Sequence, residues 1–428
     1  MNSGDTAWML IASGLVFLMT PAVAFFYGGM VRAKAILHMM MLSVGAIAVV
    51  GIAWAVCGWS IAYGGQSVGG IFGNPWTGDF FHGVISLNNG VYTATGGSAS
   101  GDYPITVDAL FQMTFAIITV ALITGSLAER VKFSTWLVFA FVWTIVDYAP
   151  LAHMVWNHGL LSADGAISQL LGVQAHDFAG GTVVHINAAV AALVLALLIG
   201  RRKGFGTVPF KPHNVPFVLL GAFLLWIGWF GFNGGSAFAA NGTAAYAIIS
   251  TTLCACAATL GWLLVEKLRT GHATPVGAAS GMVAGLVGIT PSADVVAPWW
   301  ALVIGFIVGA VCCVAISAKF KLGIDDSLDV VGVHGVGGVI GTVCVGLFAA
   351  SGGLVTTGDI RLTLVQILIA LITIAFSGVV TFALAFVLEK TMGWRVGTYT
   401  EITGIDIVQH GERSYDFSDT SLSLRRRS

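Results

Sequence analysis

Charged residues are scarce in this sequence, and that scarcity excludes several classes of protein. Only 9% of the 428 residues are Asp, Glu, Lys or Arg, against about 25% in a typical soluble domain. The 19 basic residues nearly balance the 20 acidic ones, so the chain lacks the basic face through which a protein binds nucleic acid. With 57% apolar residues it is not intrinsically disordered, and so few charges cannot solvate a soluble enzyme of 44.5 kDa. The class that fits is a protein that spans a membrane several times.

Other absences narrow the function further. No basic segment precedes the first apolar run, so residues 6–31 are predicted to be a retained membrane span and not a cleaved signal peptide. No Gly-Lys-Ser/Thr loop is present and the inner connections are short, which disfavours ATP-driven pumping by this chain. The cysteines lie in apolar runs without metal-type spacing, so we expect buried thiols, no disulfide framework and no metal site. They are Cys57, Cys254, Cys256, Cys312, Cys313 and Cys344.

The sequence contains many long runs of apolar residues. A helix needs about 20 apolar residues to cross the hydrocarbon core of a bilayer. Marking such runs predicts an all-α membrane protein with eleven transmembrane helices. The predicted spans are residues 6–31, 35–63, 106–129, 133–157, 180–200, 215–238, 244–266, 275–292, 296–318, 330–351 and 361–389.

The positive charges indicate an orientation. If the N-terminus lies outside, 18 of the 19 Lys and Arg residues fall on the cytoplasmic side, and only Arg361 falls outside. The positive-inside rule favours this arrangement, so we predict N-out and C-in. Residues 1–389 then form the transmembrane domain, with an extracellular loop at 64–105 that holds no Lys or Arg. Residues 390–428 form a cytoplasmic tail.

Two segments share a chemical signature. Residues 177–185 open the fifth span and residues 326–334 open the tenth, and in each a His follows an Asp by eight positions. Five spans separate the segments, and five is odd, so the second copy enters the membrane from the opposite side. The pattern predicts an inverted repeat of five plus five helices, with one helix added at the C-terminal end.

The repeat predicts that His185 and His334 meet. Eight helical residues place each His about 12 Å from its Asp, so both reach the middle of a core about 30 Å thick. Two neutral imidazoles there can share one N–H···N hydrogen bond and contact a small polar solute. Two unrelated histidines, each bonded to a backbone carbonyl, are the alternative. At the helix starts, Asp177, Asp326 and Asp329 are expected to cap free N–H groups, and Asp177 could add negative potential at the outer mouth.

Aromatic residues gather at three places near these spans, at 111–115, 153–156 and 228–236. Phe111 and Phe115 share one helical face, and the other two clusters lie at the outer ends of spans four and six. Trp and Phe around a hydroxyl can bind an ammonium-type cation through cation–π contact and hydrogen bonding. Packing and interface belts use the same residue types, which is the alternative interpretation.

These motifs resemble the ammonium transporter family (the Amt/MEP/Rh superfamily), in its bacterial Amt type. The most specific match is Asp-Phe-Ala-Gly-Gly-Thr-Val-Val-His-Ile-Asn at 177–187. The resemblance implies ammonium uptake across the cytoplasmic membrane by a homotrimer with one narrow hydrophobic pore per subunit. It also implies no enzymatic activity, no cofactor and a cytosolic PII-type regulatory partner. The matching stretches are residues 25–29, 127–130, 153–156, 177–187, 228–236 and 329–338.

The resemblance further implies roles for individual residues. The chain departs from the family pattern after about residue 395 and ends Arg425-Arg426-Arg427-Ser428. The implied roles are an outer ammonium site of Trp156, Ser236 and Phe115, a stacked phenyl gate of Phe115 and Phe232, paired pore histidines His185 and His334, and supporting positions at Asp177, Trp229, Thr182 and Asp329.

The implied mechanism begins with NH4+ at the outer site. An apolar lining cannot replace the hydration that the ion loses, so deprotonation would let NH3 cross the dry section past the histidines, with or without its proton. Other candidate functions are an ammonium sensor that signals through the tail, an intramembrane enzyme and a CO2 channel. The Asp–His separation of about 12 Å argues against an enzyme, and competition by methylammonium would distinguish an ammonium pore from a gas channel.

Overall fold

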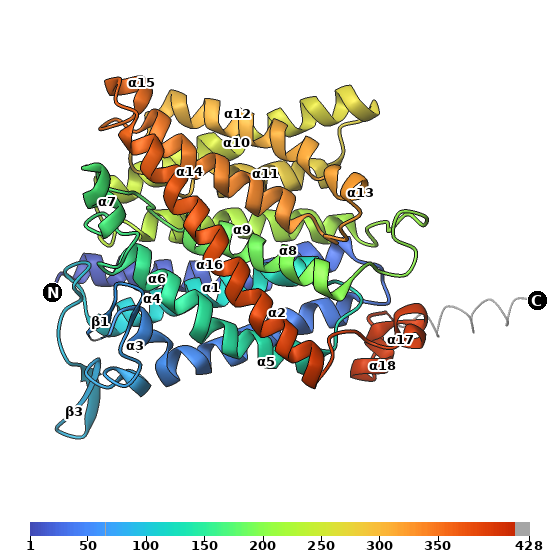
Figure 1. Ribbon diagram of the computed structural model, residues 1–428, viewed down its shortest axis with the longest axis horizontal. Helices are drawn as coiled ribbons and strands as arrows, with labels where there is room; N and C mark the ends of the chain where they lie inside the picture. The colour runs from blue at the N-terminus through green and yellow to red at the C-terminus, as the bar shows by residue number, and fades with distance from the viewer. Residues whose placement is uncertain (65, 416–428) are drawn as a thin grey trace, which may run out of the picture.

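The computed structural model describes residues 1–64 and 66–415, which form a bundle of long helices. Figure 1 shows these helices side by side along the longest axis of the molecule. The N-terminus lies at one end, and α17 (Thr398–Thr403) and α18 (Ile405–His410) lie at the other. The predicted terminal Arg425–Arg427 cluster lies outside the described residues.

Within residues 1–64 and 66–415, ten helical segments are long and apolar enough to cross a membrane, which indicates a multi-pass membrane protein. Helix α11 (Pro275–Ile289) fills the remaining predicted run, at 275–292, with 15 residues. At 1.5 Å per residue it is about 22 Å long, shorter than the hydrocarbon core of about 30 Å. The helical fold class is therefore confirmed, and the eleventh crossing stays a prediction. The ten segments comprise α1 (Ser3–Met30); α2 (Ile36–Ala53) with η1 (Trp54–Gly58) and α3 (Trp59–Ala62); α4 (Ile105–Ile123) with η3 (Thr124–Leu127); α5 (Phe133–Trp143) with η4 (Thr144–Tyr148) and α6 (Ala149–Trp156); η5 (Gly181–Ile186) with α8 (Asn187–Ile199); α9 (Val215–Gly235); α10 (Gly242–Thr270); α12 (Pro298–Ala315) with α13 (Ala318–Leu322); η6 (Val331–Gly335) with α14 (Val336–Phe348); and α16 (Arg361–Thr391).

Short elements occupy the connections. The long loop after α3 folds back on itself in two small antiparallel sheets, one of β1 with β2 and one of β3 with β4. Its polar, Gly-rich composition gives strands of only two to four residues. The short elements are β1 (Ser67–Val68), β2 (Phe72–Gly73), η2 (Asp79–Phe81), β3 (Ile85–Asn88), β4 (Val91–Ala94), α7 (Ala166–Leu171) and α15 (Leu354–Thr357).

Ion pairs join connections that are distant in sequence at each end of the bundle. Arg32, after the first predicted span, pairs with Glu129, after the third. Arg202, after the fifth, pairs with Asp325, after the ninth. At the other end, the N-terminal amino group pairs with Asp102, between the second and third spans. The connections thus alternate between two ends, as the distribution of Lys and Arg predicts.

Small residues let the helices approach closely. A Cβ atom at Gly305 would lie 2.2 Å from the Cys254 carbonyl oxygen, and one at Gly309 would lie 2.0 Å from that of Ala258. Helix α12 therefore packs against the backbone of α10, as glycine-lined membrane helices do. The expectation that every cysteine is buried is wrong for Cys256, which is exposed on α10. An apolar run in a membrane bundle can face outward, because lipid is as apolar as the protein core.

Candidate functional site

The first repeated segment begins with a fully engaged carboxylate. Asp177 Oδ1 accepts hydrogen bonds from the backbone N–H groups of Gly180 (2.8 Å) and Gly181 (2.7 Å). Its Oδ2 accepts from the Thr182 N–H (2.8 Å) and from the Thr182 hydroxyl. These are the donors that the start of a helix leaves without partners. The prediction that Asp177 caps this segment is confirmed.

The second segment repeats the cap with Asp326. Its carboxylate accepts from the N–H groups of Val330 (3.0 Å) and Val331 (2.8 Å). The capping prediction is wrong for Asp329, whose Oδ1 instead lies 2.6 Å from Lys319 Nζ. Asp326 already occupies the capping position, and Asp329, at φ +66°, sits in a left-handed turn beside the lysine. Burial raises the pKa of Asp329 to about 6, despite the charge of Lys319.

The two histidines meet inside the bundle. Nδ1 of His185 lies 3.3 Å from Nδ1 of His334, and their ring centroids are 5.4 Å apart at an interplanar angle of 26°. The side chains are almost completely buried. In this geometry one Nδ1 donates and the other accepts, which assigns complementary neutral tautomers. Both histidines lie in π-helical turns, η5 and η6, a form that is frequent at functional sites.

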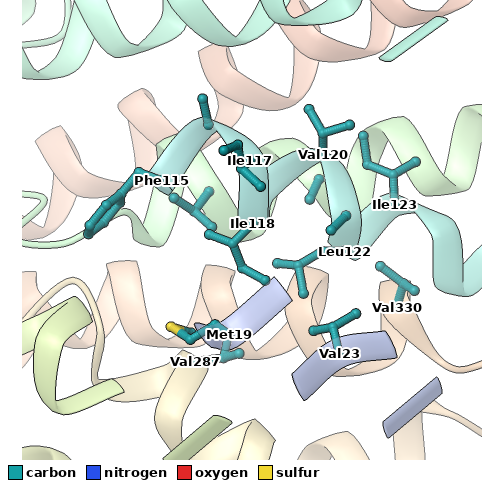
Figure 2. Close-up of a cluster of buried hydrophobic side chains, with 14 of the residues drawn as sticks. Met19, Val23, Phe115, Ile117, Ile118, Val120, Leu122, Ile123, Val287 and Val330 are labelled. Atoms are coloured by element: carbon teal, nitrogen blue, oxygen red, sulfur yellow. The ribbon is translucent and has the colours of Figure 1, made fainter. Parts of the chain in front are cut away.

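A narrow lumen runs beside the imidazole rings. Its cavity volume is about 10 Å³, which is close to the space of a single water molecule. Figure 2 shows Met19 and Val23 of α1 near Ile118 and Leu122 of α4 along this region. The hydroxyl of Tyr27, which also lines the lumen, already donates to a backbone carbonyl oxygen. The remaining lining residues are Phe26, Val184, Leu225, Trp229, Phe232 and Val283.

Two stacked phenyl rings lie between this lumen and the outer end. The centroids of Phe115 and Phe232 are 4.2 Å apart at an interplanar angle of 19°, and both rings are buried. Phe232 lines the lumen, with its centroid 5.9 Å from that of His185. Phe115 lines a second cavity and meets Trp156 edge-on at 6.1 Å. The structure thus brings the two predicted gate residues together.

The second cavity contains all three residues predicted for the outer site. Trp156, Ser236 and Phe115 line a space of about 100 Å³. The Trp156 indole N–H donates to the Asp177 carbonyl oxygen at 2.8 Å, and the Ser236 hydroxyl donates to the Phe232 carbonyl oxygen at 2.8 Å. A cation in this cavity would meet an indole, a phenyl ring and a serine oxygen, which are suitable partners for an ammonium group.

The two other supporting positions differ from each other. Trp229 lines the lumen next to His185, at a centroid distance of 5.5 Å, and its indole N–H donates to the Thr290 hydroxyl at 2.9 Å. Thr182 is fully buried and donates to Asp177. Its side chain therefore supports the cap, whereas Trp229 forms part of the wall.

Sequence reasoning did not assign several wall residues of the outer cavity. Helical spacing alone could have indicated Gln112, three residues before Phe115. Phe111 also lies on α4 and is already predicted to share a helical face with Phe115. The others come from loops or helix ends, where periodicity carries no such signal. The additional lining residues are Tyr63, Ser100, Phe111, Gln112, Phe178 and Phe238.

The two ends of the bundle differ in their charged groups. At one end, burial alone would raise the pKa of Asp325, but hydrogen bonds and charge from Arg202 and Arg130 hold it below its usual value. At the other end, burial opposes protonation of His176, but Asp294, 2.9 Å away, raises the pKa of that imidazole.

Comparisons with known proteins agree with this geometry. The family model of the Ammonium Transporter Family matches residues 7–415. An ammonium transporter of Mycobacterium tuberculosis is 49% identical, over 99% of this chain and 92% of its own length. The crystal structure of Saccharomyces cerevisiae Mep2 superposes with a TM-score of 0.86 at 33% identity, covering 98% of this chain and 92% of Mep2. A structure titled as a sensor Amt protein gives a TM-score of 0.84 at 27% identity, covering 95% and 98% of the two chains. Since the family model and these relatives span nearly the whole sequence, the chain belongs to the ammonium transporter family.

Proposed function

We propose that this protein takes up ammonium through a pore inside each subunit. NH4+ binds in the outer cavity, against Trp156, Phe115 and the Ser236 hydroxyl. It gives a proton to water at the outer mouth or to the histidine pair, and its nitrogen passes along the lumen as NH3. The observation that carries this proposal is the contact of 3.3 Å between His185 and His334 beside a narrow, mostly apolar lumen.

Desolvation favours transfer of the neutral molecule. A bare cation in a low-dielectric channel is costly unless it is paired. The lumen wall is mostly apolar, and the imidazole nitrogens are the polar groups it brings next to a solute. Neutral NH3 can accept a hydrogen bond from one imidazole and donate to another. The His pair also offers a place for a proton that follows the substrate.

The wider arrangement belongs to the same proposal. Residues 1–389 form a transmembrane channel domain of eleven helices, N-out and C-in, in the cytoplasmic membrane. The loop at 64–105 is extracellular, and residues 390–428 form a cytoplasmic tail. A homotrimer and a cytosolic PII-type partner follow from the family resemblance. The tail segment packs on the predicted inner end, where Arg395 donates a hydrogen bond to the Ile199 carbonyl oxygen at 3.2 Å.

Replacing both histidines with alanine tests the pore. We expect His185→Ala with His334→Ala to abolish selective uptake of labelled methylammonium into proteoliposomes, because the lumen would lose its polar contacts. His82→Ala, in the exposed outer loop, is the matched control and should transport normally. Current recorded with the flux over a range of pH would separate NH3 conduction from net charge transfer. Unchanged uptake and selectivity in the double variant would refute the role of the pair.

The likeness to a sensor Amt protein favours one second candidate function. A pure sensor would bind methylammonium and change its tail contacts without moving the solute. The same proteoliposomes distinguish the two functions, since saturable binding without accumulation would indicate a sensor and accumulation would indicate transport.

A further inference from the structure

A row of polar groups on α4 leads from the outer surface to the phenyl pair. Asp108, Gln112 and Phe115 are spaced by four and three residues, so they lie on one face of this helix. Phe115 and Gln112 both line the outer cavity. Asp108 lies one turn further out and is 5% exposed.

Gln112 holds an unused acceptor within the wall of this cavity. Its side chain is 5% exposed, and its carbonyl oxygen Oε1 has no hydrogen-bond partner within residues 1–64 and 66–415. The hydroxyl of Tyr63, which lines the same cavity, likewise lacks a partner there. Buried polar atoms normally have partners, so two unused ones in residues that line one cavity point to a ligand there.

Asp108 is tied to the cavity through two serines. Its Oδ2 accepts hydrogen bonds from the hydroxyls of Ser98 (2.6 Å) and Ser100 (3.3 Å). Ser100 is also a lining residue of the cavity. These hydrogen bonds hold the Asp108 carboxyl group directly behind the wall of the cavity.

The loop that carries the serines is held in place. The Ser98 N–H donates to the Tyr103 carbonyl oxygen at 2.7 Å, and the Ser100 N–H donates to Ser98 Oγ at 2.9 Å. A Cβ atom at Gly101 would lie 2.4 Å from the carbonyl oxygen of Phe238, another lining residue. The C-terminal part of the outer loop, at Gly101, therefore packs directly against the wall of the cavity.

We propose that Asp108, with Ser100 and Gln112, forms a second cation-binding wall of the outer cavity, in addition to Trp156, Phe115 and Ser236. The wall takes small alkylammonium cations, with Gln112 Oε1 and Ser100 Oγ accepting their N–H groups and Asp108 supplying the charge. This inference rests on the proposed function, because it concerns the affinity of the same site. Asp177 cannot supply the same contact, since its oxygens are engaged by the start of η5.

The test is the concentration dependence of methylammonium uptake into proteoliposomes. Asp108→Asn keeps the shape of the side chain and removes its charge, so we expect the apparent KM to rise about tenfold. The maximal rate should stay within about twofold, because the lumen is unchanged. Gln112→Leu should raise the apparent KM by about threefold to tenfold, and Asp108→Glu should restore most of the affinity.

Asp102→Asn is the matched control, because it removes a carboxylate at the same end of the bundle that is 67% exposed. An apparent KM for Asp108→Asn equal to that of Asp102→Asn would overturn the proposal. If Asp108→Asn does not fold, Gln112→Leu takes its place: an apparent KM equal to that of Asp102→Asn would then overturn the proposal. Ser236→Ala distinguishes the failure of this proposal from the failure of the proposed function. If Ser236→Ala raises the apparent KM for methylammonium and Asp108→Asn leaves it unchanged, the second wall alone is contradicted. If the wild-type protein takes up no methylammonium, the proposed function itself is contradicted.

Discussion

The two repeated segments have the same local structure but different surroundings. Asp177 and Asp326 cap their helices through the same kind of contacts. Around Asp177 the neighbours are an indole and a threonine hydroxyl. Around Asp326 are a serine hydroxyl and Lys319, whose ammonium group donates to the Asp326 carbonyl oxygen at 3.0 Å.

This difference indicates that the repeated segments build the pore, whereas the residues that flank them make its two ends chemically different. The outer copy leads from an aromatic cavity without a basic lining residue. The inner copy leads to a buried network in which Arg130 and Arg202 share Asp325. Under the proposed function, an incoming cation would meet aromatic faces at the outer end and a network of paired charges at the inner end.

The largest effect is expected when the inner network is broken. Arg202→Met removes the guanidinium group from the buried Asp325 carboxylate, which keeps the backbone N–H of residue 202 at 2.7 Å and Arg130 Nη1 at 3.7 Å. Removing one partner of a buried ion pair costs about 3–5 kcal/mol. The midpoint of thermal aggregation in detergent should fall accordingly. Arg201→Met is the control, since Arg201 donates to the Gly323 carbonyl oxygen in an exposed position. Equal midpoints for the two variants would contradict this account.

An intermediate effect is expected from the same substitution in both caps. Asp177→Asn and Asp326→Asn each replace a carboxylate with two acceptor oxygens by an amide with one. We expect each substitution to lower the free energy of unfolding by about 1–2 kcal/mol. Only Asp177→Asn should also raise the apparent KM for methylammonium, because only that cap adjoins the outer cavity. Thermal midpoints and uptake curves measured on the same preparations check both parts. A similar KM increase in both variants would show that the cap acts on the pore through folding alone.

The sequence predicted the elements of the pore better than their surroundings. The Asp–His spacing was sufficient to bring His185 and His334 together, because each helix has a fixed rise and a defined entry point. Sequence could not show that Asp329 turns toward Lys319, since that depends on a left-handed backbone conformation. Nor could it place Ser100 at the outer cavity, because the return of a long loop depends on tertiary contacts. Those two positions belong to the ends of the molecule, where the two copies of the repeat differ.

The smallest expected effect is an opposite pH response at the two ends. The raised pKa of His176 beside Asp294 means that the outer pair stabilises the fold below about pH 6.5. That contribution is lost as the pH rises through the folded-state pKa. The lowered pKa of Asp325 means that the inner network stabilises the fold above about pH 4 and is lost under stronger acid.

His176→Gln isolates the outer contribution to this response. The imidazole is 31% exposed and its partner 15%, so solvent screening keeps the effect small, about 1 kcal/mol or less. Thermal midpoints between about pH 2 and pH 9 should lose part of their alkaline decline in the variant, while the acid limb set by Asp325 stays unchanged. A variant whose acid limb moves instead would mean that the two ends are coupled through the bundle, and the account of two electrostatically separate ends would then be wrong.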